Sequence, residues 1–161
     1  MIIHNIPPVY DKNSRILILG SFPSVKSREA EFFYGHPQNR FWRVLASVIG
    51  VETPQTIEER REFLLSHGIA VWDVIASCEI EGSADNTIRA VQPNDISVIL
   101  SSADIRAIFV NGRTSKKYYD KYIKQTVGRE AMLLPSTSPA NAAVSLDALT
   151  DAWGVIKEYI L

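Results

Sequence analysis

The chain has 161 residues, of which 46% are hydrophobic and 22% are charged, and its formal net charge is −1. This is the size and composition of one globular domain, so we expect residues 1–161 to form a single domain with its own core. A net charge so close to zero argues against indiscriminate nucleic-acid binding, which depends on phosphate neutralisation by many lysine and arginine side chains.

Several classes of protein are disfavoured by what the sequence lacks. It has no apolar run of about 18 residues, as a membrane-spanning helix needs, and its first residues do not resemble a signal peptide. Cys78 is the only cysteine, which excludes an intramolecular disulfide and a cysteine-ligated zinc or iron–sulfur site. We therefore expect a monomer without a metal or other cofactor, in a reducing cytoplasm where it associates with the nucleoid.

Short apolar runs alternate with amphipathic stretches along the chain, which is typical of a parallel sheet covered by helices. Strands are expected at residues 15–20, 69–75, 106–111 and 131–134. Helices are expected to begin near Asn39, at Thr56, at Asn94, at Thr114 and at Ser145. The predicted fold class is α/β, with three α/β/α layers and a four-stranded, mainly parallel sheet.

Two of these helices have specific sequence signals. Thr56 is followed three residues later by Glu59, the pattern of a capping box, and Gly68 is expected to end that helix. In the last helix, the buried stripe is predicted to be Leu146, Leu149, Trp153, Ile156 and Ile160.

In open parallel sheets, ligands bind beyond the carboxyl ends of the strands, and three loops expected there have unusual compositions. The first is Gly20-Ser-Phe-Pro-Ser24, a turn whose backbone N–H groups could form an anion nest. It lacks the spacing of a dinucleotide-binding or phosphate-binding glycine loop.

The second segment, Phe32-Phe-Tyr-Gly-His-Pro-Gln-Asn-Arg-Phe-Trp42, concentrates aromatic residues just before a helix. We expect Phe41 and Trp42 to belong to the core, and one of the other rings to stack on a planar base, an interaction worth roughly 1–3 kcal/mol. The third segment, residues 134–141, has two prolines and several hydroxyl groups. It could be a plain surface turn or a stiff loop that grips phosphates.

Basic residues gather in two parts of the chain. Lys26, Arg28, Arg40 and Arg43 lie near the aromatic segment, and Arg113, Lys116, Lys117, Lys121 and Lys124 lie in a later predicted helix. The second group has two interpretations that the sequence leaves open, a solvated helix face or a DNA-contacting surface.

Together, these three segments resemble the uracil-DNA glycosylase superfamily over essentially the whole chain. Gly-His-Pro-x-Asn-Arg-Phe-Trp is similar to its mismatch-specific branch, and Gly-Ser-Phe-Pro-Ser with Ser-Thr-Ser-Pro-Ala-Asn is similar to its hypoxanthine-DNA glycosylase branch, family 6. The resemblance implies a monofunctional base-excision-repair enzyme acting on double-stranded DNA that contains a deaminated base, most simply hypoxanthine from deoxyinosine. Uracil remains the alternative base.

The resemblance also implies roles for single residues. The first motif contributes Ser21, Phe22 and Ser24, where Phe22 replaces the water-activating Asp or Asn of most relatives. In family 6 the catalytic residue is an Asn that corresponds to Asn39. Tyr34 and Asp73 occupy positions where relatives stack on the flipped base and read its edge. The second motif, which contacts DNA in relatives, corresponds to Ser136, Thr137, Ser138, Pro139, Ala140 and Asn141.

The chemistry of these side chains limits what each can do. Asn39 is neutral, so it can orient a water but is a poor base, and catalysis should depend mainly on positioning and electrostatics. Asp73, if ionised, can only accept hydrogen bonds and would suit an N–H on the base, although a plain turn carboxylate is the alternative. His36 is expected to pack within its loop, with an electrophilic role as the other interpretation.

Two other classes of function stay open. A serine hydrolase could use Ser21, Ser24 or Ser138, but the Gly-x-Ser-x-Gly elbow is absent. A DNA binder without catalytic activity would follow if Phe22 marks a lost active site.

Overall fold

The computed structural model describes residues 1–4 and 6–160, and its centre is a four-stranded parallel sheet. The strand order is β3-β2-β6-β7, formed by β3 (Ile69–Asp73), β2 (Ile16–Gly20), β6 (Ala107–Asn111) and β7 (Met132–Leu134). Each of these strands falls within one of the four predicted ranges, which confirms the expected parallel sheet. β2 is an inner strand, so its carboxyl end lies between the carboxyl ends of β3 and β6.

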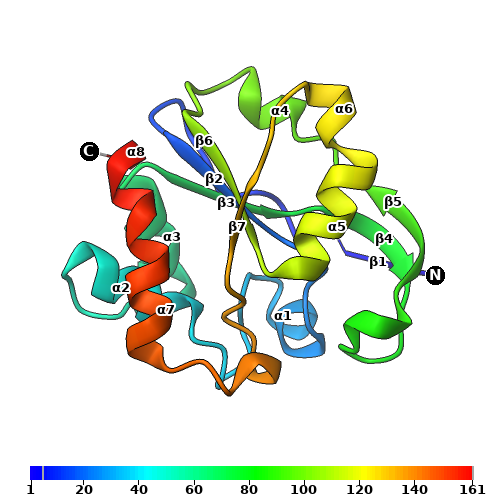
Figure 1. Cartoon of the computed structure of the whole chain (residues 1–161), viewed down its shortest axis with the longest axis horizontal. Coiled ribbons are helices and arrows are strands. Elements are labelled where there is room, and N and C mark those ends of the chain that lie inside the picture. Colours follow the sequence, from blue (N-terminus) through cyan, green and yellow to red (C-terminus); the bar gives the residue numbers. More distant parts are fainter. Residues whose placement is uncertain (5, 161) are drawn as a thin grey trace.

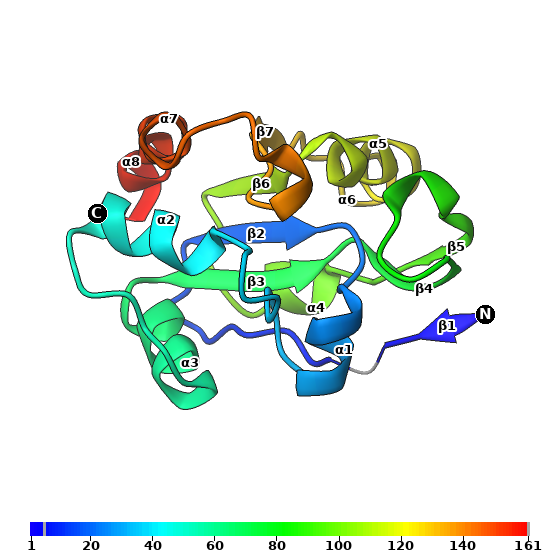
Figure 2. The same cartoon turned by 90° about the horizontal axis from the view of Figure 1, so that it is seen from below.

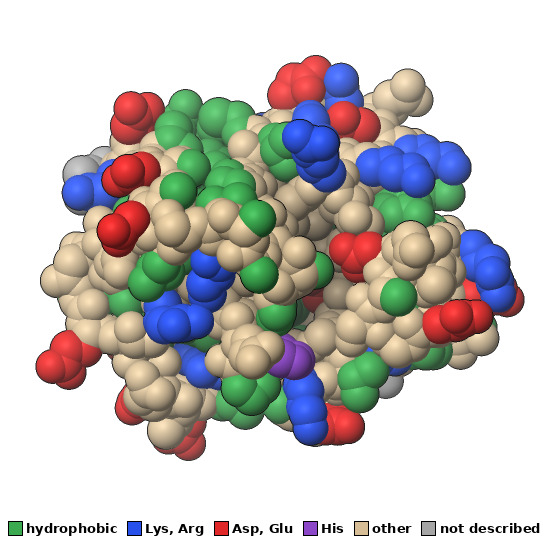
Figure 3. Space-filling model, turned by 60° about the horizontal axis from the view of Figure 1, so that its bottom comes forward, with side chains coloured by type: hydrophobic (Ala, Val, Ile, Leu, Met, Phe, Trp, Pro, Cys, Tyr) green, Lys and Arg blue, Asp and Glu red, His purple; other side chains and the backbone are tan. Residues whose placement is uncertain are grey.

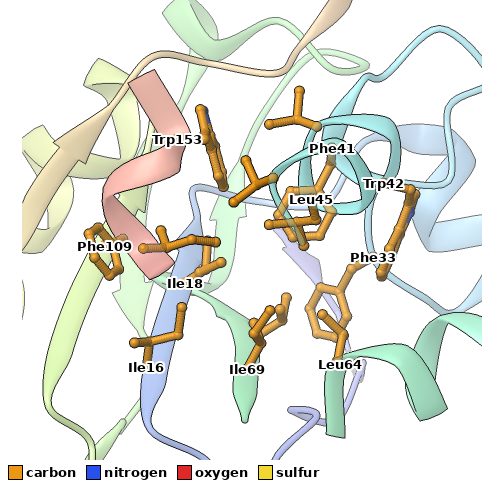
Figure 4. Close-up of a cluster of buried hydrophobic side chains, with 14 of the residues drawn as sticks. Ile16, Ile18, Phe33, Phe41, Trp42, Leu45, Leu64, Ile69, Phe109 and Trp153 are labelled. Atoms are coloured by element: carbon orange, nitrogen blue, oxygen red, sulfur yellow. The ribbon is translucent and has the colours of Figure 1, made fainter. Parts of the chain in front are cut away.

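Helices cover both faces of this sheet, as expected for three α/β/α layers (Figure 1). Ile16 and Ile18 point to the face covered by α2 (Phe41–Ile49), α3 (Ile57–Ser66) and α7 (Leu146–Trp153). Leu17 and Leu19 point to the other face, covered by α4 (Ser97–Leu100) and α5 (Arg113–Tyr122). All four side chains are buried because both faces of the strand pack against helices. Figure 4 shows the first of these two cores, in which aromatic side chains from α2 and α7 pack over the strands.

The sequence signals for the helix starts hold in most cases. Thr56 and Glu59 form the predicted capping box, and Ser145 caps α7 by accepting from the backbone N–H of Ala148. The last predicted helix consists of α7, a 3-10 turn (Gly154–Ile156) and α8 (Lys157–Ile160). In its predicted apolar stripe, Leu149, Trp153 and Ile156 are buried. α6 (Lys124–Val127) directly follows α5.

The prediction that Asn94 caps a helix is wrong. The side chain of Asn94 instead donates to the carbonyl of Asp73, and Asp95 accepts from the backbone N–H of Ser97 at the start of α4. Asn94 therefore ties the segment before α4 to the end of β3, next to the loops that follow the central strands.

A second sheet was not predicted. The expected strand at residues 69–75 ends at Asp73, and the chain continues into β4 (Ile75–Glu79), which pairs antiparallel with β1 (Ile2–Ile3) and β5 (Arg89–Pro93). Figure 2 shows this small sheet beside the end of the parallel sheet, close to α1 (Val25–Ala30). The loop between β4 and β5 contains a 3-10 turn (Asp85–Thr87). Within residues 1–4 and 6–160, no helix is long and apolar enough to cross a membrane.

Candidate active site

A pocket of about 310 Å³ opens at the carboxyl ends of the parallel strands. This volume lies within the range of small-molecule sites. Figure 3 shows a hollow on the face that lies at the bottom of Figure 1, with both acidic and basic side chains around it. Every predicted site residue except Asn141 lines the pocket: Ser21, Phe22, Ser24, Tyr34, Asn39, Asp73, Ser136, Thr137, Ser138, Pro139 and Ala140. Segments more than 100 residues apart in the sequence thus meet as the resemblance implied.

Three residues form the floor of the pocket. Gly20 ends β2 and pairs in register with Asp73, the last residue of β3. A Cβ on Gly20 would lie 2.5 Å from Oδ1 of Asp73 and 2.9 Å from the hydroxyl of Tyr34. Only glycine at position 20 leaves room for both side chains, so the carboxyl of Asp73 and the phenol of Tyr34 can lie against the backbone of Gly20.

Asp73 is buried without a partner for its charge. Its side chain is 3% exposed, and Oδ2 has no hydrogen-bond partner among the described residues. Burial raises the pKa of this carboxyl to about 7, because a charge without compensation is costly in an apolar environment. The expectation of a simple ionised acceptor is therefore incomplete, since the neutral acid is populated at neutral pH.

Tyr34 lies in a strained part of the loop. Its φ is +51°, a left-handed conformation that is unusual for an aromatic residue. The ring stacks on Phe41 with 3.9 Å between centroids, so only its opposite face remains for a planar base. Its hydroxyl is buried without a partner among the described residues. Burial, together with the nearby carboxyl of Asp73, raises the pKa of Tyr34 well above its usual range, so the phenol stays protonated.

Asn39 is held by two different segments. Its Oδ1 accepts from the backbone N–H of Phe41 at 2.9 Å and from the hydroxyl of Thr137 at 2.9 Å. The amide of Asn111, at the end of β6, donates in turn to that hydroxyl at 3.0 Å. The backbone N–H of Phe41 fixes the orientation of the amide, because only the oxygen can accept from it. Among residues 1–4 and 6–160, Nδ2 has no protein partner, and it is the free polar atom of this side chain.

This network corrects the prediction for Thr137, which was expected to contact DNA. Thr137 is fully buried, and its hydroxyl is committed to Asn39 and Asn111. Its backbone N–H donates to Asn111 and its carbonyl accepts from Arg40. Thr137 therefore joins the loops of the pocket and has no polar group left for a phosphate.

The rest of the second motif folds into a compact turn. The hydroxyl of Ser136 accepts from the backbone N–H of Ser138, and that of Ser138 caps the 3-10 turn Pro139–Asn141. Asn141 donates to the carbonyl of Ser136 at 2.9 Å, which places its side chain behind the turn rather than in the pocket. Pro139 and Ala140 remain at the rim, where a wedge that enters DNA would have to lie.

Two arginines of the first basic group hold the loops around the pocket. Arg40 donates to the carbonyls of Asn141 and Val144, which joins the aromatic segment to the second motif. Arg28 donates to the carbonyl of Gly82 at 2.7 Å and lies over the ring of Phe22. In the second group, Lys116 and Lys124 form ion pairs with acidic residues. Much of the basic charge thus serves the fold.

The first motif forms one wall. Phe22 is 8% exposed and packs edge-on against His4, so it presents an apolar surface to the pocket. The hydroxyl of Ser24 caps α1 and that of Ser138 caps its own turn. Among the described residues no histidine is hydrogen-bonded to Ser21, Ser24 or Ser138, although the nucleophile of a serine hydrolase needs such a base. His36 also lines the pocket, and its Nδ1 accepts from the backbone N–H of Gln38.

The sequence analysis missed other residues that line the pocket. Asn111 ends β6, and the rule that ligands bind beyond strand ends could have identified it. Ser83 and Asp85 come from the loop between β4 and β5. No signal pointed to them, because their position depends on the antiparallel sheet. Among the described residues, no three His, Cys, Asp or Glu side chains come together as a metal site.

Comparisons with known proteins agree with this arrangement. Residues 7–156 match the family model described as the uracil DNA glycosylase superfamily. A protein named hypoxanthine DNA glycosylase from Methanosarcina barkeri is 38% identical over 150 residues, which are 91% of this chain and 92% of that protein. One of the same name from Methanosarcina acetivorans is 37% identical over 147 residues, 90% and 92% of the two chains. The solution NMR structure of a Methanosarcina acetivorans protein assigned to the uracil DNA glycosylases superposes with a TM-score of 0.80. That match has 33% identity and covers 98% of this chain and 99% of the other.

Proposed function

The chain belongs to the uracil DNA glycosylase superfamily and is a DNA glycosylase, and we propose that it releases hypoxanthine from deoxyinosine in duplex DNA. The observation that carries the proposal is the pocket at the strand ends, where Asn39, Tyr34 and Asp73 converge. A base must leave the duplex to reach such a pocket, at a cost of a few kcal/mol that is smallest for a mismatched base. Hypoxanthine opposite thymine is such a base.

Asn39 is the proposed catalytic residue. Because Oδ1 already accepts two protein hydrogen bonds, the amide N–H groups remain to hold the attacking water through its oxygen. Cleavage of the N-glycosidic bond develops positive charge on the sugar and negative charge on the leaving base. A neutral amide cannot remove a proton efficiently, so the rate depends on positioning and on fixed dipoles. The backbone of residues 21–24 is the proposed source of such dipoles near the base.

Tyr34 and Asp73 are the proposed base-binding groups, with Ser21 and Phe22 completing the wall. The loops that contain Ser24, Ser136 and Ser138 would contact and position the flanking phosphates. Pro139 and Ala140 would enter the gap left by the flipped nucleotide. Asn141 supports that turn from behind. We further propose that the protein acts as a monomer, in the cytoplasm at the nucleoid.

Base release from two matched duplexes tests the proposal, one with a single deoxyinosine and one with a single deoxyuridine, in the presence of EDTA. We expect hypoxanthine release without any added metal. Release of uracil alone would overturn the substrate while keeping the enzyme class. Binding of both duplexes without release of either base would mean that Phe22 marks a site without catalytic activity.

A further inference from the structure

Two unpartnered polar groups lie next to each other on the floor of the pocket. Only four buried side-chain atoms among the described residues lack a hydrogen-bond partner, and two of them are the Tyr34 hydroxyl and Asp73 Oδ2. Both side chains lie against Gly20, and no hydrogen bond joins them. Buried polar groups in native proteins nearly always have partners, so a pair of orphans in a pocket indicates that a ligand supplies them.

The surroundings of Asp73 favour its neutral acid. No lysine or arginine lines the pocket, and no side-chain or backbone donor bonds the carboxyl oxygens. The other titratable groups that line it are Tyr34, His36 and Asp85, while His4 and Arg28 contact the ring of Phe22. An acid without a counter-ion in such a site gains a proton more readily than a free carboxyl, as the raised pKa of Asp73 also indicates. Protonated, it offers an O–H donor beside the phenol O–H.

Two adjacent donors fit one edge of one class of base. A 6-oxopurine presents two neighbouring acceptors, O6 and N7, whereas adenine presents N7 beside an amino donor. Uracil has a single carbonyl oxygen on the corresponding edge. We propose that neutral Asp73 and Tyr34 together donate to O6 and N7 of the flipped base, so that Tyr34 meets the base through its hydroxyl and not by face-on stacking. This makes the pair the specificity-determining element for 6-oxopurines.

This inference rests on the proposed function for its choice of base, but it makes a separate statement about how that base is recognised. An ionised Asp73 would accept from N1–H and would favour binding at high pH. A neutral Asp73 donates and favours binding at low pH. The two cases therefore differ in the sign of the pH dependence.

The test is binding to a duplex with one 2′-fluorinated deoxyinosine, whose glycosidic bond resists hydrolysis, relative to the same duplex without the lesion. We expect the preference of the wild-type protein for the lesion to fall at least tenfold between pH 6 and pH 8.5. Asp73→Asn keeps a donor that does not titrate, so its preference should be independent of pH. Tyr34→Phe keeps the ring stacked on Phe41 and should lower the preference severalfold at both pH values.

Control variants separate the pair from other groups. His36→Gln and Asp85→Asn should keep the wild-type pH dependence, and Tyr122→Phe, at the end of α5 and outside the lining of the pocket, should bind like the wild type. A wild-type preference that is constant or rises with pH would overturn the inference. Hydrolysis of deoxyinosine without pH-dependent binding would overturn this inference and leave the proposed function intact. Binding that depends on pH as expected, without hydrolysis of ordinary deoxyinosine, would support the inference and overturn the proposed function.

Discussion

At the scale of single residues, the site depends on a chain of hydrogen bonds that runs from Asn111 through Thr137 to Asn39. Asn111 ends β6, Thr137 lies in the loop after β7, and Asn39 precedes α2. These hydrogen bonds therefore join three separate segments of the protein. Their effect is to turn Asn39 so that the amide nitrogen is free. Asn39 therefore owes its proposed role to Thr137 and Asn111 as much as to its own position.

Thr137→Val keeps the shape of the side chain but removes this link. The amide of Asn111 then loses a buried acceptor, a change that costs roughly 1–3 kcal/mol. We expect a lower free energy of unfolding in urea and at least a tenfold slower single-turnover base release. Thr126→Val, at an exposed position in α6, is the matched control. If Thr137→Val releases base at the wild-type rate, the link does not position Asn39.

Asp73 should also make stability depend on pH. In the unfolded chain its pKa is near the ordinary value of about 4, and in the folded chain it is about 7. The folded state therefore holds a proton that the unfolded state releases, so stability falls as pH rises through this window and the penalty is complete above it. Relative to the wild type, Asp73→Asn should gain stability between pH 5 and pH 8, by on the order of a few kcal/mol.

Urea unfolding at both pH values measures this difference, with the exposed Asp151→Asn as the control. A difference between Asp73→Asn and the wild type that stays the same at pH 5 and pH 8 would mean that Asp73 is ionised in the folded protein.

At the scale of elements, Arg40 connects the start of α2 to the turn that carries Pro139 and Ala140. It donates to two carbonyls of that segment, of Asn141 and Val144. A guanidinium can reach both at once, whereas an ammonium group lacks this fork geometry. The turn that would enter DNA is therefore held in place by the aromatic segment, and binding and catalysis should respond together when this contact is lost.

Arg40→Lys keeps the charge and removes the fork. We expect about a tenfold loss of kcat/KM on deoxyinosine DNA, as losing roughly 1.4 kcal/mol of positioning would produce. The salt dependence of DNA binding should not change. Arg43→Lys, one turn away on the exposed face of α2, should behave like the wild type. Wild-type activity in Arg40→Lys would contradict the fork and show that Arg40 acts only through its charge, and equal losses in the two variants would show that its two carbonyl contacts have no special role.

Elements with local signals were predictable from the sequence, and those that depend on distant pairing were not. The apolar runs gave the strands at Ile16, Ile69 and Ala107, and Thr56 with Glu59 gave the cap of α3. The predicted second strand continued to Ile75, because the turn at Val74 has no glycine or proline, and the rest of β4 was not predicted. The antiparallel sheet needs β1 to pair across some 75 residues, which local patterns do not reveal.

The site shows the same division. The three motifs predicted which loops meet, and the pocket confirms that they do. The neutral environment of Asp73 and the burial of Thr137 were not predictable, because both depend on what packs around the side chain. Asp85 lines the pocket from the loop between β4 and β5, and it was missed because that loop was not predicted.

At the scale of the whole molecule, charge is spread rather than gathered. The net charge is −1, and Figure 3 shows lysine and arginine side chains scattered over the face that holds the hollow. Arg28 and Arg40 are already engaged by loop carbonyls. The molecule is therefore suited to holding DNA by a few phosphates around one flipped nucleotide.

The salt dependence of DNA binding should be correspondingly weak. Each phosphate contact contributes a slope of about −0.9 to the dependence of log affinity on log salt concentration. For three or four contacts, affinity should fall by about 40- to 150-fold between 50 and 200 mM salt. A fall of about 1,000-fold or more, measured by fluorescence anisotropy, would indicate a long basic track and contradict this picture.

The most direct test of the central claim is the single-turnover rate of hypoxanthine release from a duplex with one deoxyinosine, measured for the wild-type protein and for Asn39→Ala. Both should have the same far-ultraviolet circular dichroism and should bind the duplex with similar affinity. We expect release by the wild type and at least a tenfold slower rate for Asn39→Ala. Equal rates for the two folded proteins would contradict the account, because the water would then be positioned by another group.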